Sequence, residues 1–171
     1  MHPILCMPEK ETIRRARKDK REGKAPSTQA GEFVREEIEH IRHGKHGARS
    51  TKQAIAIGLS KARRAGVELP VPPKGQASAR TRKAAEYALE EGRSHKKPSP
   101  RRAKAMRGAL KREGRAAASP KALSRQAKTA TKRRTAASRS RAAQKAAKTK
   151  GPAGRHRAAV KAAKTRKRAA A

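Results

Sequence analysis

The sequence predicts a mostly α-helical protein: a small helical N-terminal unit followed by a long, disordered or conditionally helical basic tail. Leu, Ile, Val and Phe total only 17 of the 171 residues, too few for a large core. Ten of these 17 lie between Phe33 and Val71, and no acidic residue follows Glu113. We therefore expect a basic segment over 1–27, a small helical unit over 28–95 and a Lys/Arg/Ala-rich low-complexity tail over 96–171.

Two helices of this unit are indicated by apolar spacing. A very basic helix is expected over 9–22, ended by Gly23 and Pro26. A second is expected over 28–43, because Val34, Ile38 and Ile41 recur at i, i+4 and i+7, which places them on one helical face. Gly44 is suited to end this helix.

A third helix is predicted over 51–65, since Ser50 and Gln53 form a capping-box pattern and Gly66 follows the last turn. The proline-rich stretch 67–73 is expected to be extended and to lie over the helix pair. The unit over 28–73 is thus interpreted as a helical hairpin with an apolar strap.

Further helix starts follow from serine caps. Ser78 caps a helix over 79–91 that Gly92 ends. Ser99-Pro100 and Ser119-Pro120 combine a cap with proline at the first helical position. In the helix after Ser99, the predicted apolar face consists of Ala103, Met106 and Leu110, and the run of residues 151–154, Gly-Pro-Ala-Gly, divides the low-complexity tail.

The charge favours a polyanionic partner. The net charge is +35, and residues 101–171 contribute 25 basic side chains against one acidic one. A field of this sign attracts nucleic acid. With one Phe, one Tyr and no Trp, the chain lacks the aromatic platforms of single-strand binders, which favours contacts to the duplex backbone without sequence readout.

On a helix, Lys121, Arg125, Lys128 and Lys132 would form one cationic stripe, at i, i+4, i+7 and i+11. Arg141, Lys145 and Lys148 repeat this spacing. The candidate nucleic-acid-binding residues, taken as a collective, are Arg101, Arg102, Lys121, Arg125, Lys128, Lys132, Arg133, Arg134, Arg141, Lys145, Lys148, Lys161, Lys164, Arg166, Lys167 and Arg168.

Two resemblances bear on function. The Lys/Ala/Thr/Pro composition of the tail resembles linker-histone tails and bacterial histone-like proteins, and Ser99-Pro100-Arg101-Arg102 resembles their Ser-Pro-basic-basic motif, which implies A·T-rich minor-groove contact. The stretch 44–66 is similar to an uncharacterised bacterial family of small basic proteins, over about 7–95, which implies a bacterial origin and a shared fold unit but no activity.

These observations predict a non-specific, electrostatic DNA-binding protein of the histone-like, nucleoid-associated kind, located in the cytoplasm on the bacterial nucleoid. The alternatives are an RNA- or ribosome-associated basic protein, or a protein-interaction module that the tail localises. Acidic residues are scarce and no phosphate-binding loop or nucleophile motif occurs, so we expect no enzyme and no cofactor.

Histidines offer a further candidate site. His40 and Glu36 are spaced i, i+4 and could hold a metal ion on a helix, with His43, His46 and Glu39 nearby. Because Gly44 is expected to end the helix before His46, solvated histidines are favoured and no metal site is predicted. A helix-turn-helix role for 51–65 is also disfavoured, since its preceding connection is longer than usual.

The N-terminus remains open between two starts. Translation could begin at Met1 or at Met7, and the second start would remove Cys6, the only cysteine. The chain shows neither a signal-peptide pattern nor an apolar run that could span a membrane.

Overall fold

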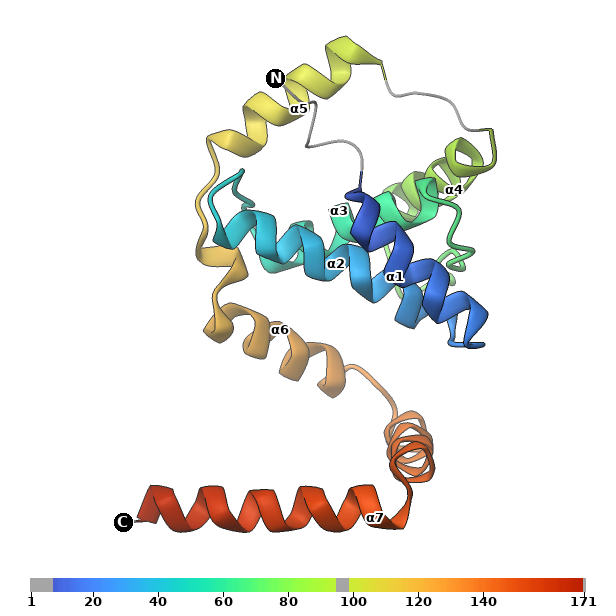
Figure 1. The fold of residues 1–171 in the computed structure, drawn as a ribbon. Helices are drawn as coiled ribbons and strands as arrows, with labels where there is room; N and C mark the ends of the chain where they lie inside the picture. Colours follow the sequence, from blue (N-terminus) through green and yellow to red (C-terminus); the bar gives the residue numbers. More distant parts are fainter. Residues whose placement is uncertain (1–7, 95–98, 171) are drawn as a thin grey trace. The chain divides into compact units, whose positions relative to one another are not determined.

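The computed structural model describes residues 8–94 and 99–170, and every regular element among them is a helix (Figure 1). The mostly α-helical prediction is therefore confirmed. The two candidate starts and Cys6 lie outside the described residues. The elements are α1 Lys10–Arg21, α2 Pro26–Arg42, α3 Thr51–Arg64, α4 Ala79–Ser94, α5 Pro100–Lys111, the short 3-10 helix η1 Ala116–Ala118, α6 Pro120–Lys132 and α7 Ala136–Ala170.

The chain divides into two compact units, one ending at Gln126 and one beginning at Ala127. In the first, α2 packs against α1 and α3, and α3 also packs against α4. Helices α2 and α3 come very close at Gly58, where an added Cβ would lie 2.7 Å from Val34 Cα. The predicted hairpin is thus present, and it depends on a glycine at the helix contact.

One apolar cluster joins α1, α2, α3 and the strap. Its buried members are Ala16, Ala30, Phe33, Ala62 and Val67, and Leu69 packs against them. The Arg63 guanidinium donates hydrogen bonds to the strap carbonyls of Leu69 (3.4 Å) and Pro70 (3.2 Å), and burial lowers the pKa of Arg63. The strap predicted over 67–73 therefore lies on the helix pair through Val67 and Leu69.

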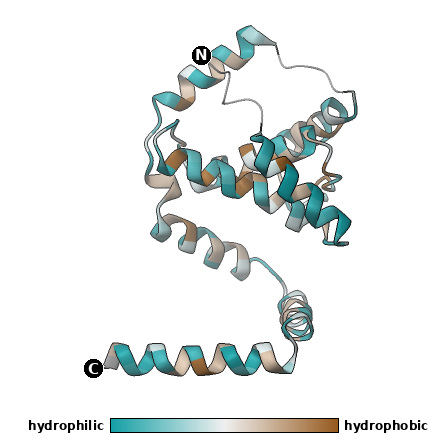
Figure 2. Ribbon diagram, viewed as in Figure 1, coloured by the Kyte–Doolittle hydropathy of each residue, from teal (hydrophilic) through white to brown (hydrophobic). Residues whose placement is uncertain are grey.

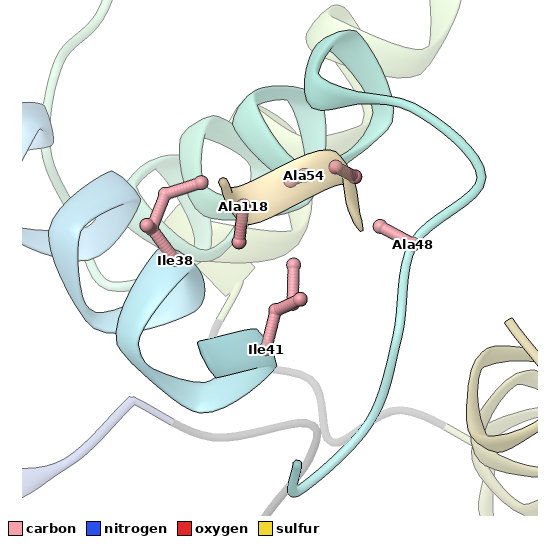
Figure 3. Packing of buried hydrophobic residues seen from close by; sticks show 6 residues of the cluster. Ile38, Ile41, Ala48, Ala54 and Ala118 are labelled. Atoms are coloured by element: carbon pink, nitrogen blue, oxygen red, sulfur yellow. The ribbon is translucent and has the colours of Figure 1, made fainter. Parts of the chain in front are cut away.

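A second apolar cluster contains residues from the region that the sequence analysis assigned to the tail. Ile38 and Ile41 of α2 point toward η1, which contributes Ala117 and Ala118, with Ala48 and Ala54 beside them (Figure 3). The partly buried Leu123 of α6 also packs here. Leu110, at the end of α5, is 5% exposed. Residues beyond 96 thus belong to the packed core of the first unit. The domain boundaries expected from the sequence stay predictions.

Most helix ends follow the sequence signals. The Ser50 hydroxyl accepts a hydrogen bond from the Gln53 amide (3.2 Å), as a capping residue does. The Gln53 side chain accepts from the Arg49 amide instead of closing the box on Ser50. Gly44 and Gly66 have φ of 74° and 85°, the left-handed conformation that ends a helix.

Further details of the sequence prediction were wrong. Ser99 makes no capping hydrogen bond with its side chain at the start of α5. Gly92 does not end α4, which continues to Ser94; it is buried where α4 meets α3, and a Cβ there would collide with the carbonyl oxygen of Arg63. Met106 is not on a buried face but is 55% exposed, because only the end of α5, at Leu110, reaches the core.

The tail is helical in the structure, so the expectation of a disordered segment does not match it. The Ser119 hydroxyl caps α6 by accepting from the Ala122 amide, and the Thr135 hydroxyl caps α7 by accepting from the Ser138 amide. Alanine has the highest helix propensity and fills much of both helices. Within α7, Gly151 takes a non-helical φ of 65°, and Pro152 follows it, so α7 is kinked at the run that divides the tail sequence.

Among the described residues, we find no helix with the length and apolar character needed to cross a membrane.

Candidate nucleic-acid interface

Helix α6 presents the predicted cationic stripe away from the core. Leu123 packs against the cluster around Ile41. At about 100° per residue, Lys121, Arg125, Lys128 and Lys132 fall on the side of α6 opposite Leu123. All four side chains are exposed. The apolar anchor therefore determines which face of α6 is left for a partner.

Basic residues recur along the whole length of helix α7. Its 35 residues include twelve Lys and Arg and no acidic residue. Hydrophilic segments occur along its whole length, without the continuous apolar face that a core helix has (Figure 2). Val160, its one large aliphatic residue, is 43% exposed. The helix thus has no evident packing role, and its surface is available for an anionic partner.

Every one of the 16 candidate residues is exposed, including Arg101 and Arg102 at the start of α5. Arg134 also donates to the Ser138 hydroxyl (3.2 Å) and carbonyl (3.1 Å), which joins the α6–α7 connection to the first turn of α7. The candidates are distributed over three helices, α5, α6 and α7, and the α6–α7 connection at Arg133 and Arg134.

Sequence reasoning missed basic residues that share these faces. Arg157 stands four residues before Lys161, so that Arg157, Lys161, Lys164 and Arg168 repeat the i, i+4, i+7, i+11 spacing of the α6 stripe. The same spacing rule could have found it. A cleft of about 480 Å³ in the first unit, lined by Lys45, Lys111 and Arg115 among others, gave no sequence signal because its lining comes from segments far apart in the chain.

A buried polar cluster corrects the prediction for the histidines. His40 and His46 are 2% and 4% exposed, not solvated, whereas His43 between them in the sequence faces the solvent. The left-handed turn at Gly44 reverses the chain after α2 and returns His46 to the core, where its Nε2 lies 3.3 Å from Glu37 Oε1. The turn that was expected to separate the histidines brings them together.

Ion pairs connect this cluster to Glu9, the residue before α1, and to Lys61 of α3. His40 Nε2 and Lys45 Nζ both contact Glu9 Oε1, at 2.8 and 2.9 Å, and these hydrogen bonds lower the pKa of Glu9 to about 2. The Glu9 amide donates to Glu36. Lys61 of α3, 4% exposed, has its Nζ 2.7 Å from Glu37 Oε2.

Comparison with known families identifies one part of the chain. Residues 10–75 match a family of unknown function (DUF6496). The match spans α1, α2, α3 and the strap, and is narrower than the expected similarity over 7–95. It contains Glu36, Glu37, His40, His46 and Lys61. Neither the curated proteins nor the solved structures gave a match to the chain.

Proposed function

We propose that this chain is a non-enzymatic, histone-like protein that binds duplex DNA electrostatically, without sequence readout, and compacts it in the bacterial nucleoid. The observation that carries the proposal is α7, whose 35 residues on either side of the kink at Gly151 include twelve basic side chains, no acidic residue and only one large aliphatic side chain. Such a helix has no apolar face to bury against a core, and its positive charge repels other copies of the chain. Phosphates are the partner that its charge fits best.

The α6 stripe supports the same function. Its basic residues recur along one exposed face, where they can follow a phosphate backbone. Neutralising about ten phosphates would release their counterions and give a slope near −9 for log K against log salt. Like charges at i, i+4 oppose an isolated helix by a few tenths of a kcal/mol per pair. Binding to phosphates removes this repulsion and so stabilises the helices of the tail, which thermal melting followed by circular dichroism with and without DNA would measure.

The test is a salt series of duplex-DNA binding by protein stripped of co-purified nucleic acid. We would compare the full chain with a variant whose twelve basic α7 residues are glutamine, and with a control in which twelve α7 alanines are glutamine. The proposal expects the first variant to lose affinity and salt slope and the control to keep both. Equal loss in the two variants would contradict it. Equal affinity for folded RNA and duplex DNA would favour the RNA-associated alternative.

A further inference from the structure

The buried cluster of α2 holds more polar groups than its own contacts satisfy. Glu37 is 0% exposed, Glu36 and His40 are 2% exposed, and His46 and Lys61 are 4% exposed. Lys61 Nζ and Glu37 Oε2 are ion-paired with each other at 2.7 Å, and the side-chain atoms that remain without a hydrogen-bond partner are Glu36 Oε1, Glu37 Oε1, His40 Nδ1 and His46 Nε2. Since a buried polar group without a partner is costly, these atoms favour a further bound group at this position.

The hydrogen bonds of each histidine determine which nitrogen is bare. His40 Nε2 bonds to the Glu9 carboxylate, so this nitrogen is the donor and Nδ1 carries the lone pair. His46 Nδ1 bonds to the carbonyl oxygen of Gly47 at 3.0 Å, so this nitrogen is the donor and Nε2 carries the lone pair. Both lone pairs belong to unpartnered nitrogens inside the cluster.

The contact between His46 and Glu37 shows why a cation is needed. With the proton on Nδ1, the Nε2 lone pair of His46 faces Glu37 Oε1 at 3.3 Å, and two acceptors repel at that distance unless a proton or a metal ion lies between them. Donors bound about 2.1 Å from one tetrahedral ion are themselves about 3.4 Å apart. The observed spacing therefore fits two ligands of one ion.

The net charge of the buried cluster also favours a bound cation. Glu36 and Glu37 contribute two negative charges and Lys61 one positive charge, so the buried cluster keeps a negative charge when both imidazoles are neutral. An uncompensated charge in the interior is costly. This negative charge favours the binding of a cation.

We infer that Glu37, His40 and His46 form a binding site for one Zn²⁺ ion. The metal-binding atoms of these three residues lie within 4.8 Å of one another. Two imidazoles and one carboxylate are a ligand set that Zn²⁺ favours. The ion would connect α2 to the segment after Gly44 and so stabilise the packing of α1, α2 and α3.

The surroundings match those of metal ligands in proteins. A ligating histidine commonly donates its other N–H to a carboxylate or a carbonyl, as His40 does to Glu9 and His46 does to Gly47. Lys61 pairs with Oε2 of Glu37 and leaves Oε1 for the ion. His46 also lines the cleft of about 480 Å³, which gives the ion a path from solvent.

The test is a Zn²⁺ titration of full-length, chelator-treated protein carrying Cys6→Ser, which removes a competing thiol ligand. We expect one Zn²⁺ per chain by calorimetry and elemental analysis, a rise in Tm, and the visible absorption of tetrahedral Co²⁺ when cobalt replaces zinc. His46→Gln and Glu37→Gln should abolish these effects, whereas the matched control His43→Gln, at an exposed histidine three residues earlier, should retain them. Glu9→Gln should weaken binding by about 10–100-fold.

A second measurement tests the site without the ligand substitutions, in case those variants do not fold. In ¹⁵N spectra of the histidine rings of the Cys6→Ser protein, Zn²⁺ should shift Nδ1 of His40 and Nε2 of His46 and leave His43 and His156 unchanged. Absence of these shifts, or equal Zn²⁺ binding by the His46→Gln and His43→Gln variants, would overturn the site. A Tm that depends on pH but not on Zn²⁺ would also overturn it, because a proton would then lie between His46 and Glu37.

Discussion

The Thr51 hydroxyl, at the start of α3, donates a hydrogen bond of 2.7 Å to the carbonyl oxygen of Ala117, 66 residues further along the chain. Arg42 of α2 donates to the neighbouring carbonyl of Ala118 at 3.0 Å. The basic C-terminal region is therefore attached to the hairpin by hydrogen bonds as well as by apolar contacts. A chain cut after residue 97 would lose part of its core, so deletions that probe the tail should keep η1 and α6.

Leu110 tests this attachment. Its side chain is 5% exposed, and Leu110→Ala should lower the free energy of unfolding by about 2–5 kcal/mol, since a buried leucine leaves a cavity when it is truncated. Met106→Ala, on the same helix but 55% exposed, should change it little. Urea unfolding followed by circular dichroism measures both. If the two substitutions cost the same, α5 does not pack on the hairpin.

Gly58 tests the contact between α2 and α3. In Gly58→Ala the added Cβ would lie 2.7 Å from Val34 Cα and 3.0 Å from its amide nitrogen, and backbone atoms cannot move aside cheaply. We expect a loss of about 1–3 kcal/mol in unfolding free energy, as for other overpacked sites.

The matched control for Gly58 is Gly108→Ala in α5, where an added Cβ meets only the Arg112 guanidinium at 3.8 Å. This change should raise the stability by up to about 1 kcal/mol, because alanine is the better helix former. Thermal unfolding of the two variants should therefore move in opposite directions, and a stabilising Gly58→Ala would show that α2 and α3 are further apart.

Local signals predicted the helices well but not what the tail contributes to the core. Spacing at i, i+4 and i+7 found α2, and Ser50, Ser78 and Ser119 marked three helix starts. Ala117 and Ala118 could not be recognised as core residues, because the same alanine pattern fills exposed α7. Their burial depends on contacts with α2 and α3, which sequence spacing does not contain.

The two candidate sites likewise differ in how far the sequence predicts them. The basic stripes follow from helical spacing and could be predicted residue by residue, including Arg157, had the pattern been extended. The histidine cluster could not, because the position of His46 depends on how the chain turns at Gly44 and on Lys61 approaching from another helix. The position of this cluster is therefore determined by packing between segments that are distant in the sequence.

Gly151 and Pro152 provide a test of the interruption in α7. Gly151 has a φ of 65°, which an L side chain rarely adopts, and proline clashes with the preceding turn of a continuous helix. The double change Gly151→Ala, Pro152→Ala should join the two parts of α7 and raise the helical signal in circular dichroism. Gly154→Ala, which adds a Cβ in ordinary contact with Lys150, should raise it much less. The salt slope of DNA binding should stay the same in both variants because no charge changes; an altered slope would mean that the kink positions the basic residues.

The α6 stripe gives the most direct test of where DNA binds. Changing Lys121, Arg125, Lys128 and Lys132 to glutamine removes four exposed positive charges from one face of α6 without touching Leu123 on the other. If each contacts a phosphate, the slope of log K against log salt should become shallower by about 3–4, at about 0.9 per contact.

The control for the stripe removes the same charge elsewhere. Lys10, Arg17, Lys20 and Arg21 are four exposed basic residues of α1, and their replacement by glutamine lowers the net charge of the chain equally. If binding is localised to the C-terminal helices, this variant keeps the salt slope of the unchanged chain, since distant charges make no phosphate contacts. Equal flattening of the slope in the two variants would instead mean that DNA contacts the whole basic surface, and the assignment of the interface to α6 and α7 would be wrong.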